Sequence, residues 1–160
     1  MLTLVRSAAV LALSLATIAP AAAQDVPNLS GTWVMDAAKS DFGPIPAPAT
    51  RSDVIDHREP ALTIKRSILT PGAAAPSVVD LKYQVDGKPH TNTTPQGDIT
   101  STLKWDGKVL VVTSQVPTPG GPADVTDRFS LSADGKTLTQ NRTIAVQGQE
   151  IAQIIILVKQ

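Results

Sequence analysis

From Leu29 almost to the end of the chain, apolar and polar residues alternate with a period of two. This alternation is typical of β-strands that bury one face, and no convincing helical period follows it. The pattern predicts strands near residues 29–36, 51–58, 61–69, 77–85, 88–94, 98–105, 108–116, 124–132, 136–146 and 149–159. The stretch from Asp36 to Phe42 is the one place where a short helix is expected.

Asp-Gly-Lys occurs three times, at residues 86–88, 106–108 and 134–136, each time between two predicted strands. Asp-Gly readily takes the positive φ angles of a two-residue hairpin turn, so the three copies predict consecutive antiparallel hairpins. Such turns also predict which residues face each other: Asp127 and Arg142, Phe129 and Gln140, Leu103 and Leu110, Ser101 and Val112, Tyr83 and His90, Leu81 and Asn92, and, across Gln147-Gly148, Arg142 and Gln153.

Three proline-rich stretches, at residues 43–48, 71–76 and 117–122, are predicted to be loops because proline cannot donate to a central ladder. The connections after the first, third, fifth and seventh predicted strands are interpreted as long, and those after the second, fourth, sixth and eighth as tight. Alternate connections of an up-and-down meander lie at the same end, so we expect a mouth with long loops and a floor of tight turns. The short Gln147-Gly148 turn is an exception on the mouth side.

Residues 1–23 have the pattern of a secretory signal peptide: one positive charge within Met1 to Arg6, an apolar run, and small residues ending at Ala23. Cleavage there would leave residues 24–160 as a single domain. A transmembrane anchor is the alternative interpretation, but the apolar run is shorter than the ~20 residues that span a bilayer. We therefore expect a periplasmic or secreted protein with no transmembrane anchor.

The composition narrows the function classes. The chain has no cysteine, which excludes disulfides, thiolate metal sites, a cysteine nucleophile and the lipid-modified cysteine of a lipoprotein. A small secreted eukaryotic domain would often carry disulfides, so their absence favours a bacterial origin. The formal net charge is zero and no Lys/Arg cluster is present, which gives no support to a nucleic-acid partner.

The segment Gly31-Thr32-Trp33 resembles the G-x-W element that opens the first strand of calycins, the superfamily of lipocalins, fatty-acid-binding proteins and avidins. Residues 31–33, 38–44, 105–107 and 132–139 also resemble a group of secreted bacterial lipocalin-like proteins of unknown function. The resemblance implies an all-β fold, an antiparallel up-and-down meander β-barrel of about 8–10 strands. It also implies structural roles for Gly31 and Trp33, with Trp33 at the barrel floor beneath a basic side chain, for which Arg142 is the candidate.

The predicted inner face carries polar residues, which need partners when buried. One interpretation is an internal network in which Asp127 pairs with Arg142, helped by Gln153. The other is that Arg142 and its neighbours hold an acidic or polar group of a small ligand, because a guanidinium donates two parallel hydrogen bonds to a carboxylate. The candidate ligand-binding residues are Arg142, Tyr83, His90, Gln140, Gln153 and Ser101.

Three function classes remain open. The first is a secreted or periplasmic carrier of a small lipophilic, partly apolar or acidic ligand. The second is a plugged structural or interaction module of the cell envelope, favoured by apolar residues on both faces of the last strand, with no partner indicated by name. The third is an enzyme in a calycin-like barrel, although no catalytic motif occurs. No cofactor or metal site is expected, and His57 is predicted to be a solvated or capping residue.

Overall fold

The computed structural model describes residues 25–160, so the predicted signal peptide at residues 1–23 lies outside the described residues. The described chain folds into strands only. They are β1 (Gly31–Met35), β2 (Thr50–Arg58), β3 (Ala61–Leu69), β4 (Ser77–Gln84), β5 (Pro89–Thr94), β6 (Gly97–Asp106), β7 (Val109–Val116), β8 (Ala123–Leu131), β9 (Thr137–Val146) and β10 (Gln149–Lys159). Within residues 25–160, no helix is long and apolar enough to cross a membrane.

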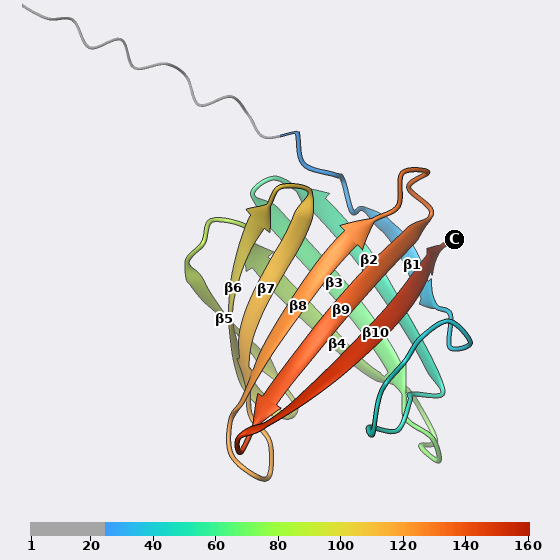
Figure 1. Ribbon diagram of the computed structural model, residues 1–160, viewed down its shortest axis with the longest axis vertical. Helices are drawn as coiled ribbons and strands as arrows, with labels where there is room; N and C mark the ends of the chain where they lie inside the picture. The colour runs from blue at the N-terminus through green and yellow to red at the C-terminus, as the bar shows by residue number, and fades with distance from the viewer. Residues whose placement is uncertain (1–24) are drawn as a thin grey trace, which may run out of the picture.

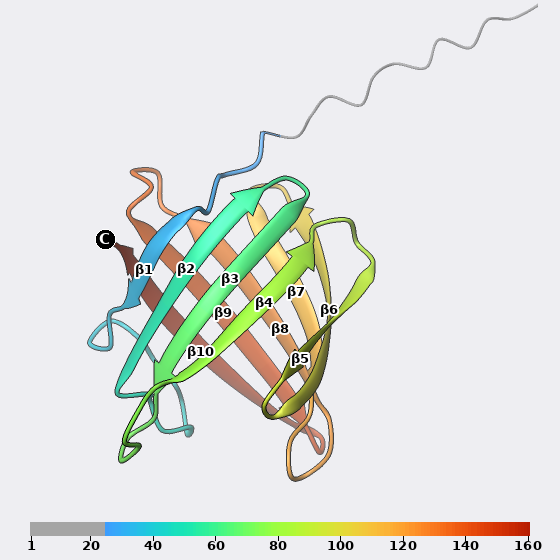
Figure 2. The ribbon, with the colours of Figure 1, turned by 180° about the vertical axis from the view of Figure 1, so that it is seen from behind.

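The strands form one antiparallel sheet in the order β4-β3-β2-β1-β10-β9-β8-β7-β6-β5. Because β1 pairs with both β2 and β10, the sheet curls round into a barrel (Figure 1). Its two free edges, β4 and β5, face each other on the far side of that view (Figure 2). The predicted all-β up-and-down barrel is therefore confirmed, and it is nearly closed.

The predicted registers are confirmed for the last two hairpins. Asp127 faces Arg142 and Phe129 faces Gln140 across β8 and β9, and Arg142 faces Gln153 across β9 and β10. The registers agree here because Asp134-Gly135 and Gln147-Gly148 stand at the centre of their turns, as predicted.

The registers predicted at the other two Asp-Gly turns are wrong. Asp106 still belongs to the ladder and pairs with Val109, so Leu103 faces Val112 and Ser101 faces Ser114. This shift by two residues leaves every side chain on its predicted face.

The Tyr83–His90 and Leu81–Asn92 pairs do not form, because β4 and β5 are not ladder neighbours. The backbone N–H of Gly87 in the connecting turn donates to the Leu103 carbonyl of β6, 2.9 Å away. This turn residue therefore bonds to β6 and does not take part in a β4–β5 hairpin.

The connections confirm the mouth and floor with two corrections. Three long loops, β1–β2, β3–β4 and β7–β8, lie at the lower end of Figure 1, together with the short β9–β10 turn expected there. The tight turns β2–β3, β4–β5, β6–β7 and β8–β9 lie at the other end. The β5–β6 connection is the two-residue turn Pro95-Gln96 and not the long loop that the pattern predicts. The short helix predicted from Asp36 to Phe42 is a turn followed by an isolated bridge between Asp41 and Ile154.

The core fills the floor half of the barrel. Trp33 is fully buried, and its Nε1 donates to the Leu29 carbonyl oxygen at 2.9 Å. The other large apolar side chains that are fully buried are Leu29, Leu62, Leu103, Leu110, Leu138, Ile155 and Leu157. The basic group over Trp33 is Lys159, whose Nζ lies 5.3 Å from the ring centroid, and not Arg142 as predicted. Lys159 holds this place because β1 and β10 pair with Trp33 opposite Lys159.

Candidate functional site

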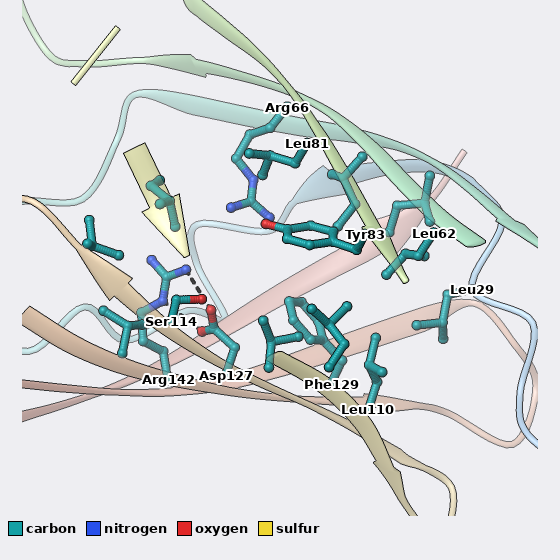
Figure 3. A pocket seen from close by; sticks show the side chains of 17 residues that line it. Leu29, Leu62, Arg66, Leu81, Tyr83, Leu110, Ser114, Asp127, Phe129 and Arg142 are labelled. Carbon is teal, nitrogen blue, oxygen red and sulfur yellow. Dashed lines mark hydrogen bonds and ion pairs between the residues drawn. The ribbon is translucent and has the colours of Figure 1, made fainter. Parts of the chain in front are cut away.

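A cavity of about 90 Å³ lies inside the barrel (Figure 3). Towards the floor its wall is apolar, with Leu29, Leu62, Leu110 and Phe129 at one side of the view. Polar groups gather at the opposite side. The cavity is lined by Leu29, Ile55, Leu62, Ile64, Arg66, Leu81, Tyr83, Ile99, Leu103, Leu110, Val112, Ser114, Val116, Val125, Asp127, Phe129 and Arg142.

The first polar cluster is built on β8 and β9. Arg142 donates to Asp127 through Nε, 2.7 Å from Oδ1, and through Nη2, 3.0 Å from Oδ2. Gln140 completes the group, since its Nε2 donates to Asp127 Oδ1 at 2.7 Å. Burial acts to raise the pKa of Asp127, but the Arg142 guanidinium and these hydrogen bonds outweigh it and hold the pKa below its ordinary value. Asp127 is therefore ionised at neutral pH.

The second polar cluster is built on β2 and β3. Asp53, fully buried, accepts from Arg51 at 3.2 and 2.6 Å and from Arg66 at 3.0 and 2.8 Å. Burial opposes ionisation of Asp53, yet the two guanidinium groups hold its pKa well below the usual range. Burial, followed by the charge of Arg66, lowers the pKa of Arg51 to about 10. The single carboxylate of Asp53 thus forms ion pairs with two arginines.

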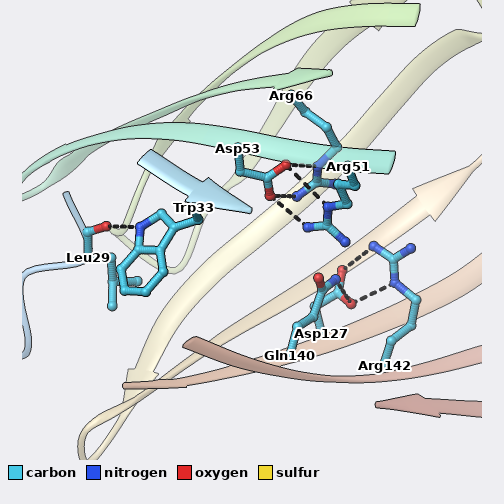
Figure 4. Close-up of polar contacts among 8 residues, drawn as sticks. All are labelled: Leu29, Trp33, Arg51, Asp53, Arg66, Asp127, Gln140 and Arg142. Carbon is cyan, nitrogen blue, oxygen red and sulfur yellow. Dashed lines mark hydrogen bonds and ion pairs between the residues drawn. The ribbon is translucent and has the colours of Figure 1, made fainter. Parts of the chain in front are cut away.

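The two clusters face each other across the barrel (Figure 4). Together they hold three guanidinium groups, of Arg51, Arg66 and Arg142, against two carboxylates, which leaves one positive charge in excess (3 − 2 = 1). Arg142 also contributes to lowering the pKa of Arg51, so the two clusters share one electrostatic environment. The excess charge is partly exposed, since the Arg142 side chain keeps 24% of its surface accessible. The arrangement can hold an anionic group between the clusters.

Two further predicted candidates lie at this cavity. Tyr83 is buried in the wall, and its hydroxyl lies beside Arg66 in Figure 3. Burial raises the pKa of Tyr83, so the hydroxyl is protonated and can donate a hydrogen bond. Ser101 lies behind the wall, where its Oγ is 2.7 Å from Oγ of Ser114, a lining residue.

The remaining candidates do not line the central cavity. Gln140 is fully buried behind Asp127, and its Oε1 has no hydrogen-bond partner within the described residues. Gln153 lies nearer the mouth and donates to the Phe42 carbonyl at 3.1 Å, so it does not support the Asp127–Arg142 pair as predicted. His90 lies at the β4–β5 turn, where its Nε2 is 2.9 Å from Asp86 Oδ1, and it does not line the central cavity.

His57 is buried at the floor, so of the two predicted alternatives, a solvated or a capping residue, the solvated one is wrong. Its Nδ1 accepts from the Leu29 backbone N–H at 3.2 Å, which places the ring proton on Nε2, 2.8 Å from Glu59 Oε1. The same Glu59 oxygen accepts from Trp105 Nε1 at 2.6 Å. This chain of contacts pins the segment that precedes β1 and closes the floor.

Sequence reasoning missed the Arg51–Asp53–Arg66 cluster, although the signal for it is present. Alternate residues of β2, from Arg51 through Asp53 and Ile55, point inward. A tight turn at Glu59-Pro60 places Asp53 opposite Arg66 and Ile55 opposite Ile64. The apolar pair identifies the inner face and therefore places the charged pair on that face.

Two larger hollows adjoin the central cavity towards the mouth. One, of about 270 Å³, lies under the β1–β2 loop and shares Arg142 with the cavity. The other, of about 290 Å³, lies between β4 and the β5–β6 turn and shares Arg66, Leu81 and Ile99 with the cavity. Within residues 25–160, no group of three or more His, Asp and Glu side chains is arranged to hold a metal ion.

A scan against protein-family models finds no match, and a search of curated protein sequences finds none either. The fold, however, is similar to solved structures. The zebrafish ileal bile acid-binding protein complexed with cholic acid superposes with a TM-score of 0.59 and 16% identity, over 82% of this chain and 98% of that chain. Secretory abundant heat soluble protein 4 from Ramazzottius varieornatus gives a TM-score of 0.59 and 14% identity, over 83% and 95% of the two chains.

A third similar structure is the fatty acid binding protein of Schistosoma mansoni in complex with arachidonic acid. It has a TM-score of 0.55 and 11% identity, over 82% of this chain and 96% of that chain. Identities at this level establish the fold alone. The chain therefore has the calycin β-barrel fold, as the resemblance around Gly31 and Trp33 implied.

Proposed function

We propose that this protein is a secreted or periplasmic carrier that binds a small, partly apolar ligand with an acidic group inside the barrel. The observation that carries the proposal is the excess guanidinium charge at the border of an otherwise apolar cavity. The acidic group would lie between Arg66 and Arg142, and the apolar body would extend towards Leu62 and Phe129 at the floor. Two proteins of similar fold are described with acids bound, cholic acid and arachidonic acid, which supports this ligand class.

Arg66 offers a clean test of the proposal. Replacing it by methionine removes the excess charge but leaves Asp53 paired with Arg51 and Asp127 paired with Arg142. Octanoate and 1-octanol, which share a chain length and differ in the acidic group, serve as the paired ligands for calorimetric titration. We expect R66M to lose roughly 10- to 100-fold in affinity for octanoate, the size of a charged hydrogen bond, and to keep its affinity for octanol.

The matched control is R128M, which removes an exposed arginine that bonds Asp106 on the outside of the barrel. It should bind both compounds as the unmodified protein does. Equal loss of octanoate and octanol binding in R66M would show that the residue shapes the cavity and does not recognise an acid. Mass spectrometry of compounds that copurify with the protein from its own host would then identify the natural ligand class.

The proposed location rests on the first 23 residues, whose charge, apolar run and terminal Ala21-Ala22-Ala23 fit an exported precursor. Exported protein is expected to begin near Gln24 when its N-terminus is sequenced. Protein that keeps Met1 and stays in the cytoplasm would contradict the proposed location without touching the ligand proposal.

A second candidate is a structural or interaction module of the envelope that works through its outer surface. It is favoured by three exposed apolar side chains on adjacent strands: Ile154 on β10, Val34 on β1 and Val54 on β2, which are 46%, 38% and 49% exposed. If neither octanoate nor a copurifying compound is found in the barrel, the interaction module becomes better supported than the carrier function.

A further inference from the structure

The barrel has one seam without a ladder among the described strands, between β4 and β5. In Figure 2 the two strands are joined at one end by their turn and diverge towards the mouth end. All other neighbouring strands are held by backbone ladders. Parting β4 from β5 therefore breaks no ladder hydrogen bond.

The seam contains the hollow of about 290 Å³ described above. Ser77, Val79 and Leu81 of β4 line one side, and Thr94 and Gln96 line the other. Arg66 lies at its inner end and also lines the central cavity, so one guanidinium faces both spaces. An acid that came through the seam would meet this charge first.

A side chain closes the narrow end of the seam in place of a ladder. The Asn92 amide reaches from β5 to the backbone of Lys82 on β4: Oδ1 accepts from the Lys82 N–H at 2.7 Å and Nδ2 donates to its carbonyl at 3.0 Å. Asn92 is buried. These two bonds are the ones that hold the strands together near their turn.

The mouth, in contrast, is roofed by the β1–β2 loop, which is tied to β10 at several points. Asp41 and Ile154 exchange backbone hydrogen bonds of 2.7 and 2.8 Å, and Gln153 donates to the Phe42 carbonyl. The Ile156 N–H donates to Ser40 Oγ at 2.9 Å. Lifting the roof breaks all of these bonds, whereas widening the seam breaks the two of Asn92 and the side-chain hydrogen bond between Tyr83 of β4 and Ser101 of β6.

We infer that ligands reach the central cavity through the β4–β5 seam, past Arg66, and that the mouth stays closed. The inference concerns ligand entry and therefore rests on the proposed carrier function. The access route itself, however, can be measured in the barrel without any ligand. Asn92 acts as the latch that sets how far the seam opens.

The absence of native cysteine allows a test that needs no ligand. Val112→Cys places a single thiol in the cavity wall, next to β8, and its rate of alkylation by iodoacetamide measures access from solvent. In this background, Ser77→Trp and Thr94→Trp narrow the seam hollow, and Pro46→Trp narrows the mouth hollow. Thr113→Trp, on the exposed outer face of β7, is the matched control.

Each seam variant is expected to slow alkylation at least tenfold, while Pro46→Trp and Thr113→Trp leave the rate unchanged. Misfolding of a tryptophan variant cannot imitate this slowing, because unfolding exposes the thiol and speeds alkylation. Asn92→Ala should raise the rate several-fold while circular dichroism shows an intact barrel. The inference is overturned if Pro46→Trp slows the reaction as much as the seam variants, or if the seam variants leave it unchanged while circular dichroism shows an intact barrel. Failure of octanoate to bind would count against the carrier function and leave this rate comparison unaffected.

Discussion

Arg142 and Asp127 face each other on β9 and β8 and form a two-point ion pair, Nε to Oδ1 at 2.7 Å and Nη2 to Oδ2 at 3.0 Å. The pair spans the boundary between the apolar floor and the polar half of the barrel. Its geometry is the bidentate arrangement for which arginine is suited, and Arg142 still lines both the central cavity and the mouth hollow. A structural role and a ligand role are therefore compatible in this residue.

Removing one partner of the Asp127–Arg142 pair should destabilise the protein more than removing both partners. Arg142→Met leaves a buried carboxylate whose remaining partner is Gln140, so we expect a loss of about 3–5 kcal/mol in the free energy of unfolding. Arg142→Met combined with Asp127→Leu should lose clearly less. Urea unfolding of the two single variants and the double variant gives the coupling energy. Additive losses would mean that the two charges do not interact.

Trp33→Ala should destabilise the barrel by about 3–5 kcal/mol, because the indole is fully buried and its Nε1 is bonded to the Leu29 carbonyl. Trp105→Ala, at a half-buried position where the indole Nε1 bonds Glu59, is the control and should cost less. The midpoints of urea unfolding measure both. A loss below about 1 kcal/mol for Trp33→Ala would contradict its role at the floor.

His57→Leu should cost about 1–3 kcal/mol, since the buried Leu29 N–H would lose the acceptor that His57 Nδ1 provides. His90→Leu is a matched control, because that histidine is partly exposed and bonded to the partly exposed Asp86. Its effect should stay within about 0.5 kcal/mol. Equal effects of the two substitutions in thermal unfolding would show that the floor contact is not stabilising.

Stability should fall on acidification. The pKa values of Asp53 and Asp127 are lower in the folded protein than in the unfolded chain, where an aspartate has a pKa of about 3.9. The unfolded state then binds more protons below about pH 5, so the stabilisation is complete above that pH and is lost as the pH falls through about 4 and lower.

The comparison of variants checks this assignment. Asp127→Asn should be less stable at pH 7 and should show a shallower loss of stability between about pH 5 and 2, because one of the two responsible carboxylates is gone. Asp56→Asn, on the outer face of β2, is the control and should keep the slope of the unmodified protein. An unchanged slope in Asp127→Asn would assign the acid sensitivity to other groups.

Much of the fold is predictable from local pattern. Alternation of apolar and polar residues locates the strands, and the turns at Asp134-Gly135 and Gln147-Gly148 define the registers of β8, β9 and β10. Those registers are enough to place Asp127, Gln140 and Arg142 on the inner face. Sequence is sufficient here because a two-residue turn and a period of two are both local properties of the backbone.

Contacts between strands that are distant in the sequence are not predictable from local pattern. The cation over Trp33 is Lys159 because β1 closes on β10, and the β4–β5 hairpin fails because Gly87 donates to Leu103 of β6. The sequence by itself therefore determined the strands, the nearby turns and the inner face of each strand. Only the tertiary structure decided which distant strands meet, where the seam lies and that Arg51, Arg66 and Arg142 converge, because barrel closure depends on the combined twist and register of all ten strands.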